Sequence, residues 1–227
     1  MVQDLKVLER RTSADEVFDF LHAQINAMKL LPGTRISEVE VARQFDVSRQ
    51  PVREAFIRLA NHDLLLVRPQ KATVVRRFSF EKIKRARFLR MAVECEVLRR
   101  ACREPLGRYQ AKLERSIEAQ KKAIKDQDLD RFHALDYDFH KTLCAVAKCD
   151  FVFETIAENK AQVDRLCMLS LSQPATMDEL IVDHQDILKA IVNQDEEAVT
   201  QAIAHHLSRL DEVVNGIRKS HANYFED

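Results

Sequence analysis

The chain has 227 residues, of which 46% are hydrophobic, and its 36 Lys and Arg residues balance its 36 Asp and Glu residues, which fits one large or two modest folded domains. Three glycines, five prolines and no tryptophan favour an almost entirely helical chain, and five cysteines without a CxxC pair favour reduced thiols. No apolar run approaches the roughly 20 residues that cross a bilayer, and the charged residues 1–11 lack the apolar core of a secretion signal, so we expect a cytoplasmic protein with no membrane partner.

The first predicted elements are short helices separated by helix-breaking residues. Three helices are predicted, over residues 13–28, 37–45 and 48–61. Ser13 is the expected cap of the first helix, and Leu31-Pro32-Gly33 follows its end. Two strand candidates then span residues 64–68 and 73–77, joined by a short turn. Three helices followed by such a strand pair predict a small winged domain.

The third of these helices has the features of a DNA-recognition helix. Ser48 is a favourable N-cap, and Arg49 and Arg53 lie one turn apart on the same face near the helix start. That spacing lets the helix enter a major groove with both guanidinium groups forward. Apolar residues occupy the opposite face: Val52, Ala55, Phe56 and Leu59. The pattern predicts a helix packed on one side and available to DNA on the other.

The charge of the neutral chain is unevenly distributed. Residues 43–77 contain eight Lys or Arg and three Asp or Glu, so this stretch carries a local charge of 8 − 3 = +5. A basic patch suits contact with phosphates, because neutralised phosphates release their counterions. An ordinary solvated charged surface would have the same composition. The residues expected to contact double-stranded DNA are Ser48, Arg49, Gln50, Arg53, Arg43 and Lys71.

From Phe78-Ser79 onward the pattern is helical to the end of the chain. The candidate helices cover residues 80–103, 107–126, 129–148, 151–171, 177–193 and 196–222. Helices of this length joined by short breaks form a bundle. The predicted fold is therefore mainly α, with an N-terminal winged helix-turn-helix domain (residues 1–77) and a C-terminal all-helical antiparallel bundle (residues 78–227).

The predicted bundle contains one cluster of residues with ligand chemistry. Asp136 and His140 are four residues apart and share a helix face, and His184 and His206 lie on two later helices. One carboxylate and three imidazoles that meet in a bundle core would form a ligand set for a divalent metal. Spacing alone does not show that they meet, and an ordinary surface or core pair is the simpler explanation of Asp136 and His140.

Other polar residues adjoin this cluster. His133 and His205 lie on the same two helices as predicted ligands, although His205 points about 100° away from its neighbour around the helix. Asp138 and Asp183 either orient an imidazole through its second nitrogen or remain solvated.

Arg90 and Glu94 lie one turn apart on the first bundle helix. A surface ion pair within the helix is the simpler explanation of this spacing. Alternatively, Arg90 points inward and binds a carboxylate with two hydrogen bonds.

Several segments match known family patterns. The N-terminal matches are Leu31-Pro32-Gly33, Ser37-Glu38, Val47-Ser48-Arg49 and Pro51-Val52-Arg53-Glu54-Ala55 followed by Leu59. On these segments, residues 13–77 resemble the winged-helix domain of the GntR family of bacterial transcription regulators. The C-terminal matches are Arg90, Glu94, Asp136, Phe139-His140, Leu143, Asp183-His184, Ile187 and His206-Leu207. Residues 80–222 accordingly resemble the FadR-type helical domain of that family, called FCD.

The resemblance implies that Asp136, His140, His184 and His206 bind a divalent metal, with zinc first and nickel or another transition metal as alternatives. It also implies that the metal and nearby polar groups, including Arg90, bind a small carboxylate effector. The chain would then be a ligand-responsive transcription regulator without catalytic residues. We expect it to act as a homodimer on a near-palindromic DNA operator, as a repressor more than as an activator.

The chain departs from the family pattern at four positions. Val39 stands where many relatives carry Arg near the DNA backbone, and Ala72 stands where the wing usually has Gly. Gln50 replaces the common Thr, and because Gln can form two hydrogen bonds with adenine, the preferred operator is expected to differ. Asp150 stands where Asn is common.

Two other functions remain open from the sequence. A metalloenzyme that uses metal-bound water would fit the ligand set, but no residue is clearly placed as a general base, and a winged helix is hard to explain in an enzyme. A DNA-binding protein whose bundle only dimerises would bind no metal, so metal content separates it from the regulator with an effector.

Overall fold

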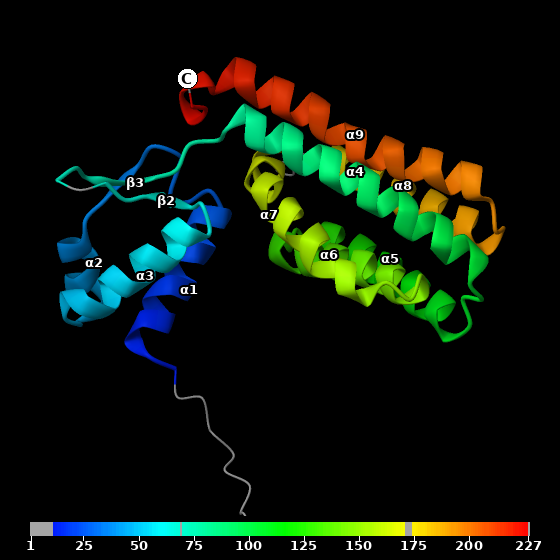
Figure 1. Ribbon diagram of the computed structural model, residues 1–227, viewed down its shortest axis with the longest axis horizontal. Helices are drawn as coiled ribbons and strands as arrows, with labels where there is room; N and C mark the ends of the chain where they lie inside the picture. Colours follow the sequence, from blue (N-terminus) through cyan, green and yellow to red (C-terminus); the bar gives the residue numbers. More distant parts are fainter. Residues whose placement is uncertain (1–10, 69, 171–173, 227) are drawn as a thin grey trace, which may run out of the picture. The chain divides into compact units, whose positions relative to one another are not determined.

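The computed structural model describes residues 11–68, 70–170 and 174–226 of the chain, so predictions for residues 1–10, 69, 171–173 and 227 lie outside the described residues. The chain forms two compact units (Figure 1). The first comprises the chain up to Phe78 together with its last residues from Asn223, and the second spans Ser79–Ala222. The boundary lies one residue after the predicted one, and the final residues belong to the first unit instead of the bundle.

Three helices build the first unit: α1 (Ser13–Asn26), α2 (Glu38–Phe45) and α3 (Arg49–Asn61). The cap of α1 is Thr12, one residue before the predicted Ser13. The Thr12 hydroxyl accepts a hydrogen bond from Asp15 N at 3.1 Å, and the Asp15 carboxylate accepts one from Thr12 N at 3.0 Å. This reciprocal pair satisfies two N–H groups that the helix start leaves without partners. The apolar faces of α1 and α3 then meet in the core of the unit.

A small antiparallel sheet completes the wing. Its strands are β1 (Arg35–Ile36), β2 (Leu65–Leu66) and β3 (Thr73–Val75), in the order β1-β3-β2. Strands β2 and β3 lie within the predicted strand pair. Strand β1 was not predicted, because two residues are too short to show alternation. Gly33, at φ +85°, turns the chain toward β3 and donates its N–H to Val75 O at 2.8 Å.

The end of the chain packs against the first unit. Phe78 N donates to Tyr224 O at 2.8 Å, and Glu226 N donates to Phe78 O at 2.8 Å, which makes a short parallel bridge. The rings of Phe78 and Phe225 lie 5.6 Å apart, and Phe225 is buried. We refer to residues 223–226 as the C-terminal tail.

The second unit is a helical bundle. Its α-helices are α4 (Phe80–Arg103), α5 (Arg108–Lys125), α6 (Leu129–Val146), α7 (Phe153–Ser170), α8 (Pro174–Val192) and α9 (Glu196–Ser220). A short 3-10 helix covers Asp150–Val152, and a second one, Ala222–Tyr224, begins at the last residue of this unit and continues into the C-terminal tail. All of the predicted helices are present, so the mainly α fold is confirmed. Helix α8 begins three residues earlier than predicted, at Pro174, where the missing N–H of proline removes no helix hydrogen bond.

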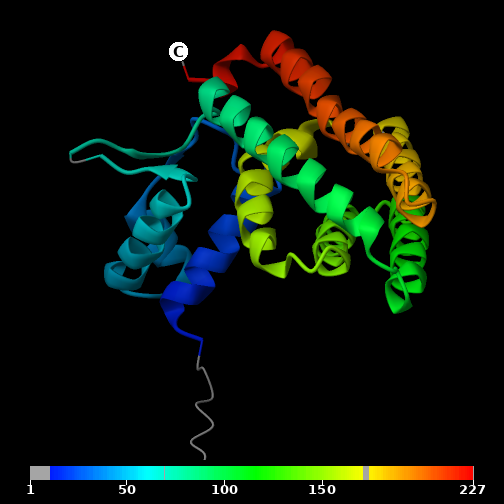
Figure 2. The ribbon, with the colours of Figure 1, turned by 45° about the vertical axis from the view of Figure 1, so that its right-hand side comes forward.

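Helices α4 and α9 run side by side in opposite directions (Figures 1 and 2). Arg103, at the end of α4, binds Glu196 at the start of α9 through two hydrogen bonds of 2.7 and 2.8 Å. Arg87, near the start of α4, pairs with Asp211 late in α9. Both ion pairs are consistent with the antiparallel arrangement of these two helices.

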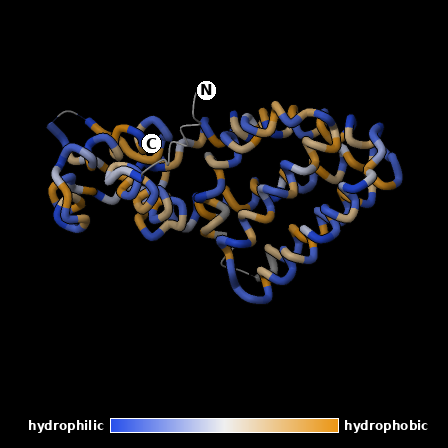
Figure 3. Tube along the Cα trace, turned by 90° about the horizontal axis from the view of Figure 1, so that it is seen from below, coloured by the Kyte–Doolittle hydropathy of each residue, from blue (hydrophilic) through white to orange (hydrophobic). Residues whose placement is uncertain are grey.

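Hydrophobic and hydrophilic residues alternate along the helices of the bundle (Figure 3). The apolar faces of α4, α5, α6, α8 and α9 contribute to one continuous core. Its largest fully buried members include Phe132, Phe139 and Leu143 of α6. Since α6 also carries two predicted metal ligands, the candidate site is built on the most deeply packed part of the bundle. In the part of the chain that the structure describes, no helix has the length and apolar character needed to span a membrane.

Candidate functional site

The residues predicted to contact DNA lie on the surface of the first unit. Arg49, Gln50 and Arg53 are exposed on α3, and Ser48 is exposed just before it. Arg43 is exposed near the end of α2, and Lys71 lies in the turn between β2 and β3. These predicted residues thus come from the three segments that a winged helix presents to DNA.

Two features of α3 in the structure differ from the sequence prediction, namely its N-cap and the contacts of its arginines. Ser48 has the extended backbone of an N-cap, at ψ 166°, but its side chain makes no capping hydrogen bond within the described residues. Arg49 and Arg53 both bind Glu38 Oε2 of α2, at 3.0 and 3.5 Å, while their side chains remain 59% and 54% exposed. An exposed ion pair contributes little stability, so a DNA phosphate or base can replace Glu38.

Not every cation of the basic stretch is available to DNA. Arg58 binds Asp15 of α1 at 2.7 Å, and its guanidinium lies 4.2 Å from the centre of the Phe18 ring. Arg76 binds Asp63 at 2.9 Å. These two arginines hold the elements of the winged unit together, so the +5 count overstates the charge that faces a ligand.

Three of the four departures from the family pattern, Val39, Gln50 and Ala72, are exposed residues of the winged unit. Val39 is 46% exposed in the first turn of α2. Ala72 is exposed between β2 and β3. Asp150 lies elsewhere, at the start of the 3-10 helix that follows α6, and is also exposed.

The predicted metal ligands converge inside the second unit. Asp136 and His140 come from α6, His184 from α8 and His206 from α9. One ring nitrogen from each of the three histidines lies within 4.8 Å of the other two. Asp136 Oδ1 lies 3.3 Å from His184 Nε2 and 3.8 Å from His140 Nε2. All four side chains are buried, so the structure brings together what spacing alone left open.

Two of the imidazoles are oriented by hydrogen bonds to their other nitrogen. His140 Nδ1 lies 2.9 Å from Glu94 Oε2, and His184 Nδ1 lies 2.8 Å from Gln120 Oε1. An acceptor at Nδ1 keeps the proton on that nitrogen and leaves the Nε2 lone pair for a ligand. Gln120 lies on α5, is fully buried, and was not predicted.

The third imidazole, His206, lies next to an ion pair. His206 Nδ1 lies 3.4 Å from Asp183 Oδ2, a longer contact than the other two. Arg209 in turn binds both oxygens of Asp183, at 2.5 and 2.9 Å. Asp183 therefore lies beside the His206 ring without a hydrogen bond to it among the described residues, and its predicted role of orienting an imidazole stays a prediction. Asp138, the other candidate, instead binds Lys112 at 3.3 Å on the surface.

The buried nitrogens of this cluster fit a divalent metal. Within the described residues, His140 Nε2 and His184 Nε2 have no hydrogen-bond partner. A buried polar atom without a partner costs about 1–3 kcal/mol, and a bound cation would accept both lone pairs. Burial lowers the pKa of His184, and burial lowers the pKa of His206 to about 4. Both rings are neutral near pH 7, which is the form that ligates metals.

Asp136 carries the negative charge of the ligand set. Burial disfavours its charged form, but the nearby Lys160 ammonium and the neighbouring His184 ring, 3.3 Å away, outweigh burial and hold its pKa well below the usual range. Lys160 Nζ, from α7, lies 3.0 Å from Asp136 Oδ2. It was not predicted, because a Lys four residues before Asp164 is typical of a surface ion pair on a helix.

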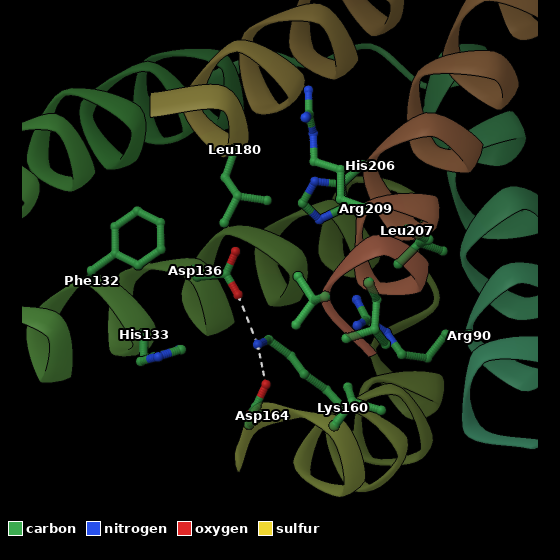
Figure 4. A pocket seen from close by; sticks show the side chains of 13 residues that line it. Arg90, Phe132, His133, Asp136, Lys160, Asp164, Leu180, His206, Leu207 and Arg209 are labelled. Atoms are coloured by element: carbon green, nitrogen blue, oxygen red, sulfur yellow. Dashed lines mark hydrogen bonds and ion pairs between the residues drawn. The ribbon is translucent and has the colours of Figure 1, made fainter. Parts of the chain in front are cut away.

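A cavity of about 80 Å³ adjoins the cluster (Figure 4). Its polar walls include Arg90, His133, Lys160, Asp164 and His206, and its apolar walls include side chains from α6, α8 and α9. A space of this size holds several waters or a small organic molecule. The cavity shares Asp136 and His206 with the cluster, so a molecule bound there would adjoin a metal.

Both explanations of the one-turn spacing between Arg90 and Glu94, an ion pair within the helix and an Arg90 that points inward, hold in part. Its Nε donates to Glu94 Oε1 at 2.7 Å, so the ion pair within α4 exists. The pair is buried instead of exposed, and Arg90 lines the cavity. Glu94 connects Arg90 to His140, which couples the cavity wall to the ligand set.

A winged helix with exposed arginines, joined to an all-helical bundle, defines the class of DNA-binding transcription regulators. Comparison with models of protein families leads to the same class of protein. Residues 13–75 match the family described as bacterial regulatory proteins, gntR family, and residues 86–209 match the FCD domain. The chain belongs to the GntR family of transcription regulators and carries an FCD domain.

Similar proteins span almost the whole chain. The HTH-type transcriptional repressor RspR of Escherichia coli K12 is 36% identical over 212 residues, which cover 93% of both chains. The gluconate operon transcriptional repressor of Bacillus licheniformis is 24% identical, covering 87% of this chain and 83% of the repressor. Among solved structures, E. coli McbR/YncC shares the fold with a TM-score of 0.71 at 20% identity, over 91% of this chain and 99% of that one. The two sequence relatives are named transcriptional repressors and the matched family consists of regulatory proteins, so the metalloenzyme alternative is set aside.

Proposed function

We propose that this chain is a cytoplasmic, homodimeric repressor whose operator affinity is controlled by a metal and a small carboxylate effector bound in the helical unit. The arrangement of the three imidazoles supports this proposal most directly. His140 and His184 each have an oxygen acceptor at Nδ1, and His140 Nε2, His184 Nε2 and His206 Nδ1 are buried without hydrogen-bond partners within the described residues. Asp136, His140, His184 and His206 would hold the metal, with zinc the first expectation for three nitrogens and one oxygen.

The effector would bind in the adjoining cavity. The metal would supply the positive charge that holds a carboxylate, and Arg90 would contribute a further cation at the wall. The effector changes operator affinity only to the extent that it binds the two states of the protein differently. Several similar proteins are named repressors, including RspR and the gluconate operon repressor, which favours a repressor here.

The operator would be bound through α3 and the wing. Arg49, Gln50 and Arg53 would contact base edges or phosphates, with Ser48, Arg43 and Lys71 around them. Two such helices in a two-fold dimer would meet two half-sites of a near-palindromic operator.

The dimer contact is proposed for the exposed apolar face of α4. Phe88 is 72% exposed and Leu89 is 43% exposed, and Ala92 one turn later is also exposed. Phe88→Glu should place a charge in this contact and weaken the dimer by at least about 2 kcal/mol. Light scattering across a concentration series measures the shift to monomer. Phe151→Glu, at a residue that is 77% exposed outside α4, is the matched control. Equal dimer affinity in the Phe88 variant and the control would exclude this face.

The test of the proposed function combines mass and DNA affinity. Native mass spectrometry of untagged protein, purified without chelator or nickel resin, should show a dimer with one metal per chain. Fluorescence anisotropy on an operator selected from random DNA should show tight binding that a small carboxylic acid weakens only when metal is present. A protein that takes up no added zinc, yet binds the operator, would favour the alternative in which the bundle only dimerises.

A further inference from the structure

A carboxylate lies between the two arginines at the start of α3. Helices α2 and α3 pack against each other in the winged unit (Figure 1). Glu38 Oε2, in the first turn of α2, lies 3.0 Å from Arg49 Nη2 and 3.5 Å from Arg53 Nη2. The Glu38 side chain is 22% exposed, whereas both arginine side chains are more than half exposed. A single oxygen atom, on the least exposed of the three side chains, therefore holds both guanidinium groups together.

This contact lowers the positive charge that α3 presents. The first turn of α3 contains no Asp or Glu, and the acidic residues in the first turn of α2 are Glu38 and Glu40. Glu38 is the one of these two that pairs with the arginines. Each phosphate that a cation neutralises adds to DNA affinity in a manner that does not depend on sequence. A carboxylate paired with Arg49 and Arg53 therefore weakens the attraction of α3 to DNA in general.

Contacts with phosphates are weakened most. A phosphate that captures Arg49 or Arg53 takes the guanidinium from Glu38 and approaches a carboxylate of the same sign of charge. The lost ion pair contributes little folding stability, but the two anions repel each other within the screening length of physiological salt. If both arginines bind phosphates, Glu38 loses both of these partners beside the anionic DNA backbone.

Contacts with guanine, in contrast, are compatible with the carboxylate. A guanidinium has five N–H donors, and each arginine uses one nitrogen for Glu38. A bidentate contact with guanine O6 and N7 needs two donors, so each arginine can bind Glu38 and guanine together. Guanine is neutral and adds no repulsion. Because both guanidinium groups contact one oxygen, they lie close enough to reach guanines in neighbouring base pairs, which are about 3.4 Å apart.

We propose that Glu38 is a specificity-determining residue of the DNA interface. Its carboxylate orients Arg49 and Arg53 toward guanines in neighbouring base pairs of each half-site, and it opposes the capture of these arginines by phosphates. Glu38 thereby raises the ratio of operator affinity to affinity for other DNA. This inference rests on the part of the proposed function in which α3 contacts the operator, and it does not depend on the metal or the effector.

Fluorescence anisotropy of the full-length protein on two duplexes tests the proposal. One duplex carries an operator selected from random DNA by the wild-type protein, and the other carries the same bases in scrambled order. Glu38→Gln keeps the length of the side chain and an acceptor oxygen but removes the charge. The ratio of the two affinities should fall at least about tenfold, mainly through tighter binding of the scrambled duplex. The log–log dependence of that binding on salt should steepen by about 1–2, because one or two more phosphates are contacted.

Glu40→Gln is the matched control for this variant. It removes the same charge from the same turn of α2, at an exposed residue. The affinity ratio should stay within about threefold of the wild type. Circular dichroism and the melting temperature establish that both variants are folded.

The wild-type protein alone gives a second measurement, which does not depend on the folding of any variant. Half-sites recovered from random DNA should contain two guanines in neighbouring base pairs. Replacing both with 7-deazaguanine, which lacks the N7 acceptor, should weaken binding at least about tenfold.

The outcomes separate this inference from the proposed function. An unchanged affinity ratio in Glu38→Gln would exclude the role of Glu38, and so would an equal fall in Glu38→Gln and Glu40→Gln. Half-sites without neighbouring guanines would exclude it as well. In each of these cases the proposed function stands if Arg49→Ala and Arg53→Ala weaken operator binding. If neither arginine variant loses affinity, α3 does not contact the operator, and the inference is wrong together with that part of the proposed function.

Discussion

The two units of this protein use charged residues in opposite ways. On the winged unit, Arg49 and Arg53 are more than half exposed and share one carboxylate partner, Glu38. In the helical unit, Asp136 and its neighbouring histidines are buried, and each has a specific partner within the described residues. Exposed charges can be exchanged for DNA at little cost in stability, whereas buried charges contribute to folding and to ligand binding together. Variants of the two units therefore need different controls.

The largest effect that separates the two units is expected when one of the buried, proposed metal-binding residues is replaced. His184→Ala should weaken metal binding by more than about 100-fold, which exceeds the loss from removing a supporting contact. It should also abolish the response to the effector while leaving basal operator binding intact. Competition with a zinc-sensitive dye measures the first effect, and anisotropy measures the other two. Loss of operator binding together with the helical circular dichroism signal would show that the site is structural.

Replacing a supporting residue should have a smaller effect. Gln120→Leu removes the acceptor at His184 Nδ1, and we expect a loss of about 10–100-fold in metal affinity. Gln110→Leu, on an exposed part of the same helix, is the control and should leave metal affinity unchanged. Equal affinities in the two variants would mean that the His184 ring needs no orientation by Gln120.

On the winged unit the effect should be confined to DNA. Arg49→Ala and Arg53→Ala should each weaken operator binding by about 1–3 kcal/mol, because each removes a cationic donor from α3. The melting temperature and the metal content should match the wild type. Undiminished affinity in both variants would rule out α3 as the helix that contacts the operator.

The smallest expected effect concerns the start of α1. Thr12→Ala removes the hydroxyl that accepts from Asp15 N and should destabilise the winged unit by about 1 kcal/mol. Chemical denaturation monitors this change. Ser13→Ala, at the position that the sequence favoured as the cap, should be nearly neutral. A greater loss in the Ser13 variant would contradict the assignment of the cap to Thr12.

The sequence predicts features that lie within one segment well, and it predicts poorly which residues from different helices come together in the fold. The arginines of α3 and the helices of the bundle follow from spacing within single segments, so periodicity was sufficient. Strand β1 has two residues and carries no periodic signal. Gln120 and Lys160 belong to the site only because α5 packs beside α6 and α8 and α7 packs beside α6. Nothing in the sequence around either residue distinguishes it from a surface residue. The metal ligands themselves were chosen through family resemblance, since a carboxylate and an imidazole one turn apart are common on helices.

The C-terminal tail has a consequence for the architecture of the chain. Because Phe78 and Phe225 form a backbone bridge, the two points at which the chain leaves and re-enters the winged unit are adjacent. Residues 79–222 are thus, in topological terms, an insertion within a winged fold whose final strand-like segment is supplied by residues 223–226. Such an insertion can in principle be excised and its ends closed by a short linker, since adjacent ends make loop closure inexpensive. A DNA-binding module in which a linker joins residue 78 to residue 223 should retain the C-terminal tail. A module that ends after β3 would lack the tail and its contacts with Phe78.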